Sequence, residues 1–152
     1  MYKKILVPLD GSELSEAILP HVSKLAKSMG AHVILLRVVP HPMQEMVFTS
    51  LPTITVQHLP AAPGQDLFAQ AEGYLQRVAF DHFPDQDITL QVTSGPTEEN
   101  ILGIATNLGV DLIAMTTHGR SGLSRMVMGS VADEIVRNSH LPILLLRPPN
   151  KS

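Results

Sequence analysis

The amino-acid sequence predicts a single α/β domain in which a doubly wound sheet of five parallel strands carries helices on both faces. Two observations predict this class. Short apolar runs alternate along the chain with segments whose apolar residues recur at helical spacing. The chain has 152 residues, the usual size of one domain, and no repeat or linker divides it. Strands that alternate with helices pair in parallel through right-handed crossovers.

The first part of the chain is expected to form two buried strands joined by a helix. Residues 5–9 and 33–39 are apolar runs of the kind found in buried parallel strands. Between them, a helical pattern begins after Ser12, a residue type favoured at the N-cap, and ends at Gly30, which suits the position after a helix. Pro20 removes a backbone donor and is expected to kink this helix.

Three more strands and three more helices are expected further along the chain. The strands are residues 88–92, which alternate apolar and polar side chains as at a sheet edge, 111–116 and 143–146. The helices are residues 67–80, 97–108 and 130–138. The domain is expected to span residues 1–147, with a proline-rich variable loop at 40–63 and a loose tail at 148–152.

Composition excludes several classes of function. A hydrophobic content of 44% argues against disorder, and the lack of cysteine excludes disulfides, thiolate metal sites and cysteine nucleophiles. The net charge of −3 gives no broad attraction to nucleic acid or anionic membranes, and no apolar run is long enough to span a bilayer. The start of the chain lacks a signal-peptide apolar region, so a cytoplasmic protein is expected.

Two predicted strand ends carry polar and glycine-rich motifs. Residues 10–12 read Asp-Gly-Ser, and residues 116–122 lead toward Gly129 and Ser130, where a helix is expected to begin. In doubly wound sheets, ligands bind beyond the carboxyl ends of the strands. Glycines at 119, 122 and 129 allow close backbone approach and positive φ angles.

The predicted helix start at Gly129 is suited to an anion. Unpaired backbone N–H groups and the helix dipole favour negative charge there, and Ser130 would cap the helix or contact a phosphate. Arg120 and Arg125 would balance phosphate charge, and His118 would contact a phosphate or brace the loop. By spacing alone an ordinary glycine-rich turn explains the pattern equally well, because it is neither a Walker loop nor a GxGxxG motif.

The run DLIAMTTHGRSGLSRMVMGSV at residues 111–131 resembles the signature of the universal stress protein family, as do the opening KKILVPLDGS and the closing HLPILLLR. The resemblance covers the chain apart from the variable 40–63 region. It implies strand order 3-2-1-4-5 and an ATP site of the family's ATP-binding branch at the sheet switch point. It implies adenine and ribose contacts near Pro8, Asp10 and Val38, and phosphate contacts at Gly119, Gly129 and Ser130.

The resemblance also extends the expected site and its partners. The remaining site candidates are Thr116, His118, Arg120, Gly122 and Val131. Mg²⁺ would be carried on the ATP phosphates rather than in a dedicated metal site, since none of the seven histidines has metal-ligand spacing. A homodimer would form through Ile143, Leu144, Leu145 and Leu146, because an uncharged edge strand of this kind is normally paired or covered.

Thr116 departs from the pattern of the ATP-binding branch, which is glycine, two residues, glycine, nine residues, glycine and serine or threonine. Gly119, Gly129 and Ser130 fit the later positions, but Thr116 replaces the first glycine. Its β-branched side chain would crowd the ribose, or its hydroxyl would bind the ribose or a phosphate. Retained ATP binding is favoured because every downstream element is present.

No catalytic constellation stands out. Ser12 and Ser130 have no identifiable histidine and carboxylate partners, and Asp10 alone is placed as a base or metal ligand for phosphoryl transfer. The expected function is an ATP-binding stress or signalling module with slow ATP hydrolysis at most. One alternative is a non-nucleotide interaction protein of the same fold that acts through its dimer surface. Another, a nucleotide-dependent transferase, lacks a substrate-side motif.

Overall fold

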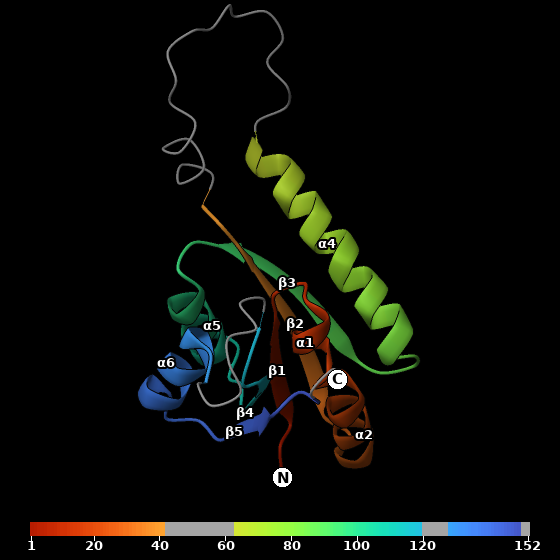
Figure 1. Cartoon of the computed structure of the whole chain (residues 1–152). Helices are drawn as coiled ribbons and strands as arrows, with labels where there is room; N and C mark the ends of the chain where they lie inside the picture. The colour runs from red at the N-terminus through yellow and green to blue at the C-terminus, as the bar shows by residue number, and fades with distance from the viewer. Residues whose placement is uncertain (42–62, 120–127, 150–152) are drawn as a thin grey trace, which may run out of the picture.

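The computed structural model describes residues 1–41, 63–119 and 128–149, which build a five-stranded parallel sheet of order β3-β2-β1-β4-β5 (Figure 1). This order is the one that the family resemblance implies. The strands are β1 (Lys4–Leu9), β2 (His32–Val39), β3 (Ile88–Ser94), β4 (Leu112–Thr116) and β5 (Ile143–Leu146). Residues 42–62 of the predicted loop and 150–152 of the predicted tail lie outside the described residues.

The helices in the described ranges are α1 (Glu13–Glu16), α2 (Leu19–Met29), α4 (Pro63–His82), α5 (Thr97–Asn107) and α6 (Ser130–Asn138). α4 is longer than the predicted helix and begins at Pro63, inside the range assigned to the loop, because proline suits a first helical turn. The strands, α5 and α6 match their predicted ranges to within two residues.

The prediction of one helix kinked at Pro20 is wrong, because the segment forms two helices. Pro20 lies in the first turn of α2, where its missing N–H has no intrahelical partner to lose. Ser12 caps α1 as predicted, since its side chain accepts a hydrogen bond from the Ser15 N–H. Gly30 ends α2 in the left-handed conformation with a φ of 62°, also as predicted.

Alternate residues of each strand feed two hydrophobic cores, one on each face of the sheet. Ile5, Val7 and Leu9 of β1 pack with α2 and α4, while Leu6 packs with α5 and α6. Figure 1 shows these helix pairs on opposite sides of the sheet. This two-layer cover explains why β1, β2 and β4 are almost entirely buried.

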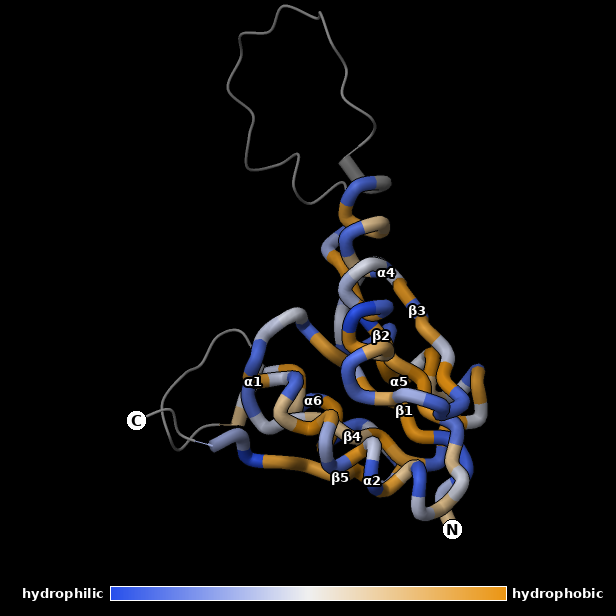
Figure 2. The backbone as a smooth tube through the Cα atoms, turned by 90° about the vertical axis from the view of Figure 1, so that its right-hand side faces the viewer, coloured by the Kyte–Doolittle hydropathy of each residue, from blue (hydrophilic) through white to orange (hydrophobic). Residues whose placement is uncertain are grey.

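The two outer strands have different surfaces. β3 lies at one edge, as its alternating pattern predicts, and all its residues are partly exposed. β5 lies at the other edge and is hydrophobic along its length (Figure 2), with Leu144 36% exposed. Among the described residues, no helix is long and apolar enough to cross a membrane.

Candidate functional site

A cavity of about 240 Å³ lies at the carboxyl ends of β1, β2 and β4, beside the starts of α5 and α6. β1 is the central strand from which the chain winds in both directions, so the cavity occupies the switch point of the sheet. Eight predicted site residues line it: Pro8, Asp10, Val38, Thr116, Gly119, Gly129, Ser130 and Val131. Arg120 and Gly122 lie outside the described residues.

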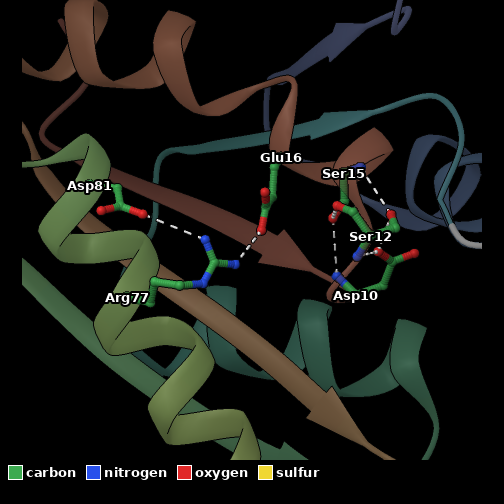
Figure 3. A network of polar contacts seen from close by, with 6 residues as sticks. All are labelled: Asp10, Ser12, Ser15, Glu16, Arg77 and Asp81. Atoms are coloured by element: carbon green, nitrogen blue, oxygen red, sulfur yellow. Dashed lines mark hydrogen bonds and ion pairs between the residues drawn. The ribbon is translucent and has the colours of Figure 1, made fainter. Parts of the chain in front are cut away.

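The turn after β1 holds the Asp10 carboxylate in place (Figure 3). The backbone N–H and the hydroxyl of Ser12 both donate to Asp10 Oδ1, at 2.9 and 2.5 Å. The same Ser12 hydroxyl oxygen accepts from the Ser15 N–H at 3.1 Å, and the Ser15 hydroxyl donates to the Ser12 carbonyl at 2.9 Å. Asp10 therefore faces the cavity from a turn that is fixed by its own neighbours.

Gly119 and Gly129 are required for close approach rather than for an unusual backbone conformation. A Cβ at Gly119 would overlap Oδ2 of Asp10, and one at Gly129 would lie 3.1 Å from the Thr117 carbonyl oxygen. Neither residue uses the positive φ angles that glycine allows: Gly129 has a φ of −57°, and Gly119 is not among the positive-φ glycines of the described chain. A side chain would therefore overlap the Asp10 carboxylate at Gly119 and crowd the Thr117 carbonyl at Gly129.

The start of α6, at Gly129 and Ser130, lines the cavity. Gly129 is the N-cap and Ser130 the first helical residue, so of the two roles expected for the Ser130 hydroxyl, capping the helix is wrong and the phosphate contact stays a prediction. The Ser130 hydroxyl is exposed and makes no hydrogen bond within the described residues. The first N–H groups of a helix have no intrahelical partner. The Asp133 carboxylate in this first turn is paired with Arg137 at 2.9 Å.

The segment after β4 is braced by two threonine side chains. Thr116 is 5% exposed, and its hydroxyl donates to the His118 carbonyl oxygen at 2.6 Å. The Thr117 hydroxyl lies 2.8 Å from His118 Nδ1. His118 does not line the cavity, which favours the bracing role over the phosphate contact that its sequence position also allowed.

The sequence did not predict four polar residues that line the cavity: Ser15, Arg37, Thr97 and Thr117. Arg37 Nη1 donates to the Val38 carbonyl oxygen at 2.7 Å, beside the predicted adenine contact. A signal was present, because Arg37 is the single charged residue in the apolar run 33–39. Thr97 begins α5, and its approach to the cavity depends on how α5 packs against β2.

A polar network connects α1, which follows the Asp10 turn, to α4 (Figure 3). Arg77 of α4 forms ion pairs with Glu16 of α1 at 3.0 Å and with Asp81 at 3.5 Å. The Arg77 guanidinium also lies 5.3 Å from the ring centroid of Tyr74. Burial, together with the Glu16 carboxylate, raises the pKa of the Tyr74 hydroxyl above its usual value. α1 is therefore held both by the hydrogen bonds of the Ser12–Ser15 turn and by the ion pair between Glu16 and Arg77.

The fold and the cavity define a doubly wound α/β protein with a cavity at the switch point of its sheet. The chain belongs to the universal stress protein family, whose family model matches residues 1–147. Universal stress protein MJ0577 of Methanocaldococcus jannaschii is 29% identical, over 99% of this chain and 98% of that protein.

Solved structures share the fold. The structure of MJ0577 matches 99% of both chains with a TM-score of 0.81 and 27% identity. A universal stress protein in complex with cAMP matches 97% of this chain and 98% of its own, with a TM-score of 0.66 and 18% identity. An Arabidopsis thaliana family protein with AMP bound matches 99% of this chain and 94% of its own, with a TM-score of 0.60 and 13% identity.

Proposed function

We propose that this chain binds ATP in the cavity at the switch point and works as a nucleotide-dependent stress or signalling module. The observation that carries the proposal is that one cavity combines an apolar wall with a polar surface suited to binding phosphate. The wall consists of Leu36, Val38, Ile101 and Met115. The polar part of the cavity, which suits phosphate, consists of the closely approaching backbones of Gly119 and Gly129 and the start of α6.

The residues fit an adenine nucleotide. Pro8, Asp10 and Val38 would hold the base and ribose, and the apolar wall would exclude water from the base. Gly119 and Ser130 would hold phosphates through backbone N–H groups and the exposed Ser130 hydroxyl. Gly129, whose N–H donates to the Thr117 carbonyl, would let a phosphate approach closely because it has no side chain. The cAMP and AMP bound by two structural neighbours support an adenine ligand. The cavity of about 240 Å³ is below the roughly 300–1,000 Å³ of typical ligand sites, so the distal phosphates would extend outside it.

The described lining supports binding rather than fast hydrolysis. Asp10 is the acidic side chain among the described lining residues, and its Oδ1 already accepts two hydrogen bonds from Ser12. Phosphoryl transfer needs both a residue that positions the nucleophile and residues that hold the metal ion. Mg²⁺ would therefore be carried on the ATP phosphates. Binding of ATP in the cavity would then change the conformation of the protein or its partners.

Calorimetry with ATP, GTP and UTP tests this function. We expect saturable binding of ATP and weaker binding of the other two nucleotides. Gly129→Val should weaken ATP binding at least about tenfold, because the larger side chain would meet the Thr117 carbonyl. Gly103→Ala in α5 is the control, since its Cβ would meet nothing within 4 Å, and it should bind like the wild type. No ATP binding at millimolar ligand would contradict the proposal and favour the interaction-protein alternative.

We also propose that β5 forms the interface of a homodimer. It is an edge strand of four aliphatic residues, Ile143–Leu146, without a charge to block pairing. Leu145 packs into the core of its own chain, whereas Leu144 is 36% exposed. Pairing of two β5 strands across a two-fold axis would satisfy their free backbone groups and cover Leu144.

A further inference from the structure

Thr116 stands where the ATP-binding branch of the family has a glycine, and its hydroxyl is already engaged within the chain. We propose that Thr116 is a positioning residue for the phosphate side of the site, which acts by fixing the Thr117–Gly119 backbone rather than by touching the ligand. This inference rests on the proposed nucleotide function. It assigns Thr116 a role that neither crowding of the ribose nor direct contact with the nucleotide describes.

The side chain of Thr116 belongs to the face of the sheet opposite the apolar wall. In β4, Leu112 and Ala114 pack in the core with α2 and α4, while Ile113 and Met115 pack in the core with α5 and α6. Strand residues alternate between faces, so the Thr116 side chain follows Leu112 and Ala114 toward α1, which contacts β4. Leu36, Val38 and Met115 of the apolar wall lie on the other face. Thr116 thus lines the cavity from the face opposite the apolar wall, and its bulk does not enter the space proposed for the base.

The hydroxyl of Thr116 instead restrains the backbone that follows β4. It donates to the His118 carbonyl oxygen at 2.6 Å from a position that is 5% exposed. A glycine has no donor for this bond. Losing a hydrogen bond costs more at a buried position than at an exposed one, because no water molecule replaces the missing partner there.

The segment that Thr116 fixes contacts β5 and two other parts of the site. The Thr117 N–H donates to the Leu146 carbonyl of β5 at 2.9 Å, and the Thr117 carbonyl accepts from the Gly129 N–H at 2.7 Å. Gly119 lies against the Asp10 carboxylate so closely that no Cβ fits. A shift of these peptide groups would therefore move the Gly119 backbone and the α6 start together, and both are assigned to phosphate contacts.

Two substitutions separate the hydroxyl from the bulk of Thr116. Thr116→Val keeps the branched shape and removes the donor, whereas Thr116→Ser keeps the donor and removes the methyl group. Calorimetry is performed with ATP and with adenosine, which lacks phosphates. Thr116→Val should weaken ATP binding roughly two- to tenfold, the value of one lost hydrogen bond, and leave adenosine binding unchanged. Thr116→Ser should bind both ligands like the wild type.

Three results would overturn the inference: wild-type ATP affinity in Thr116→Val, an equal loss in Thr116→Ser, or an equal loss for ATP and adenosine. If the wild type binds neither ligand, the proposed function fails, and hydrogen exchange of the unliganded protein decides the positioning role. Thr116→Val should then speed exchange of the Gly129 amide, which donates to Thr117. Unchanged exchange at Gly129 would refute the positioning role.

Discussion

Gly119→Ala places one methyl group at the point where two parts of the site touch. The new Cβ would overlap Oδ2 of Asp10 and lie 3.2 Å from its Cγ. The other oxygen of this carboxylate, Oδ1, accepts hydrogen bonds from the Ser12 N–H at 2.9 Å and the Ser12 hydroxyl at 2.5 Å. The Asp10 carboxylate cannot move away from the new Cβ without disturbing its hydrogen bonds to Ser12. Either Asp10 rotates away from Ser12 or the Gly119 backbone retreats.

The structure bounds the size of this effect. Inserting a methyl group into a packed site costs about 1–3 kcal/mol, and a hydrogen bond to a charged group contributes about 1.5–3 kcal/mol. We expect the free energy of unfolding to fall by about 1–3 kcal/mol, with a fall in Tm of roughly 2–4 °C for each kcal/mol. Asp10 and Gly119 both line the cavity, so ATP affinity should fall by more than about tenfold.

Thermal unfolding and ATP calorimetry of Gly119→Ala are compared with Gly103→Ala. Gly103 lies inside α5 with open space at its Cβ position, so alanine should raise stability by about 0.5–1 kcal/mol without changing affinity. The steric reasoning is refuted if Gly119→Ala melts and binds ATP like this control. A loss of stability with unchanged affinity would show that the Asp10–Gly119 contact supports the fold but not the ligand.

The remaining predictions concern assembly, pH and turnover. Leu144→Lys should convert the proposed dimer to a folded monomer in light scattering, because Leu144 is exposed and its replacement leaves the core intact; a wild type that is already monomeric at micromolar concentration would contradict the interface. The raised pKa of Tyr74 means that the folded state favours the neutral phenol, so its contribution to stability is complete below the unfolded pKa of about 10 and is lost as pH rises above it. Tyr74→Phe should therefore flatten the fall in the free energy of unfolding above about pH 10, and an unaltered fall would exclude Tyr74 as its source. Phosphate release from ATP should stay below about 1 s⁻¹, and a rate within the usual enzymatic range of about 1–10³ s⁻¹ would overturn the assignment as a binding module.

The sequence predicted the strands and their order because apolar runs and family motifs constrain them directly. Its errors fall where one residue has several compatible conformations. Pro20 suits a kink as well as a first turn, and in the structure α2 begins at Leu19, where Ile18 and Leu19 are buried in the core. Ser130 suits an N-cap, but Gly129 takes that position, with its N–H bound to the Thr117 carbonyl across the loop.

The cavity lining was predicted where the motifs are local, at Asp10, Gly119, Gly129 and Ser130, and missed where it depends on contacts across the fold. Arg37 reaches the cavity because β2 lies beside β1, and Thr97 because α5 packs over β2. The glycine requirement at Gly119 comes from Asp10, more than a hundred residues earlier in the chain. Sequence spacing alone contains no measure of that contact.

An NMR titration of the ¹⁵N-labelled wild-type protein with ATP tests the central claim most directly, because it reports both binding and its location. We expect saturable shifts of the amide signals of Asp10, Val38, Gly119, Gly129 and Ser130, all at the cavity. The signals at His32 and Asp87, which pair at the opposite end of the sheet, should stay in place. No shift at millimolar ATP, or shifts centred on the His32 end, would contradict the claim that this chain binds ATP at the switch point of its sheet.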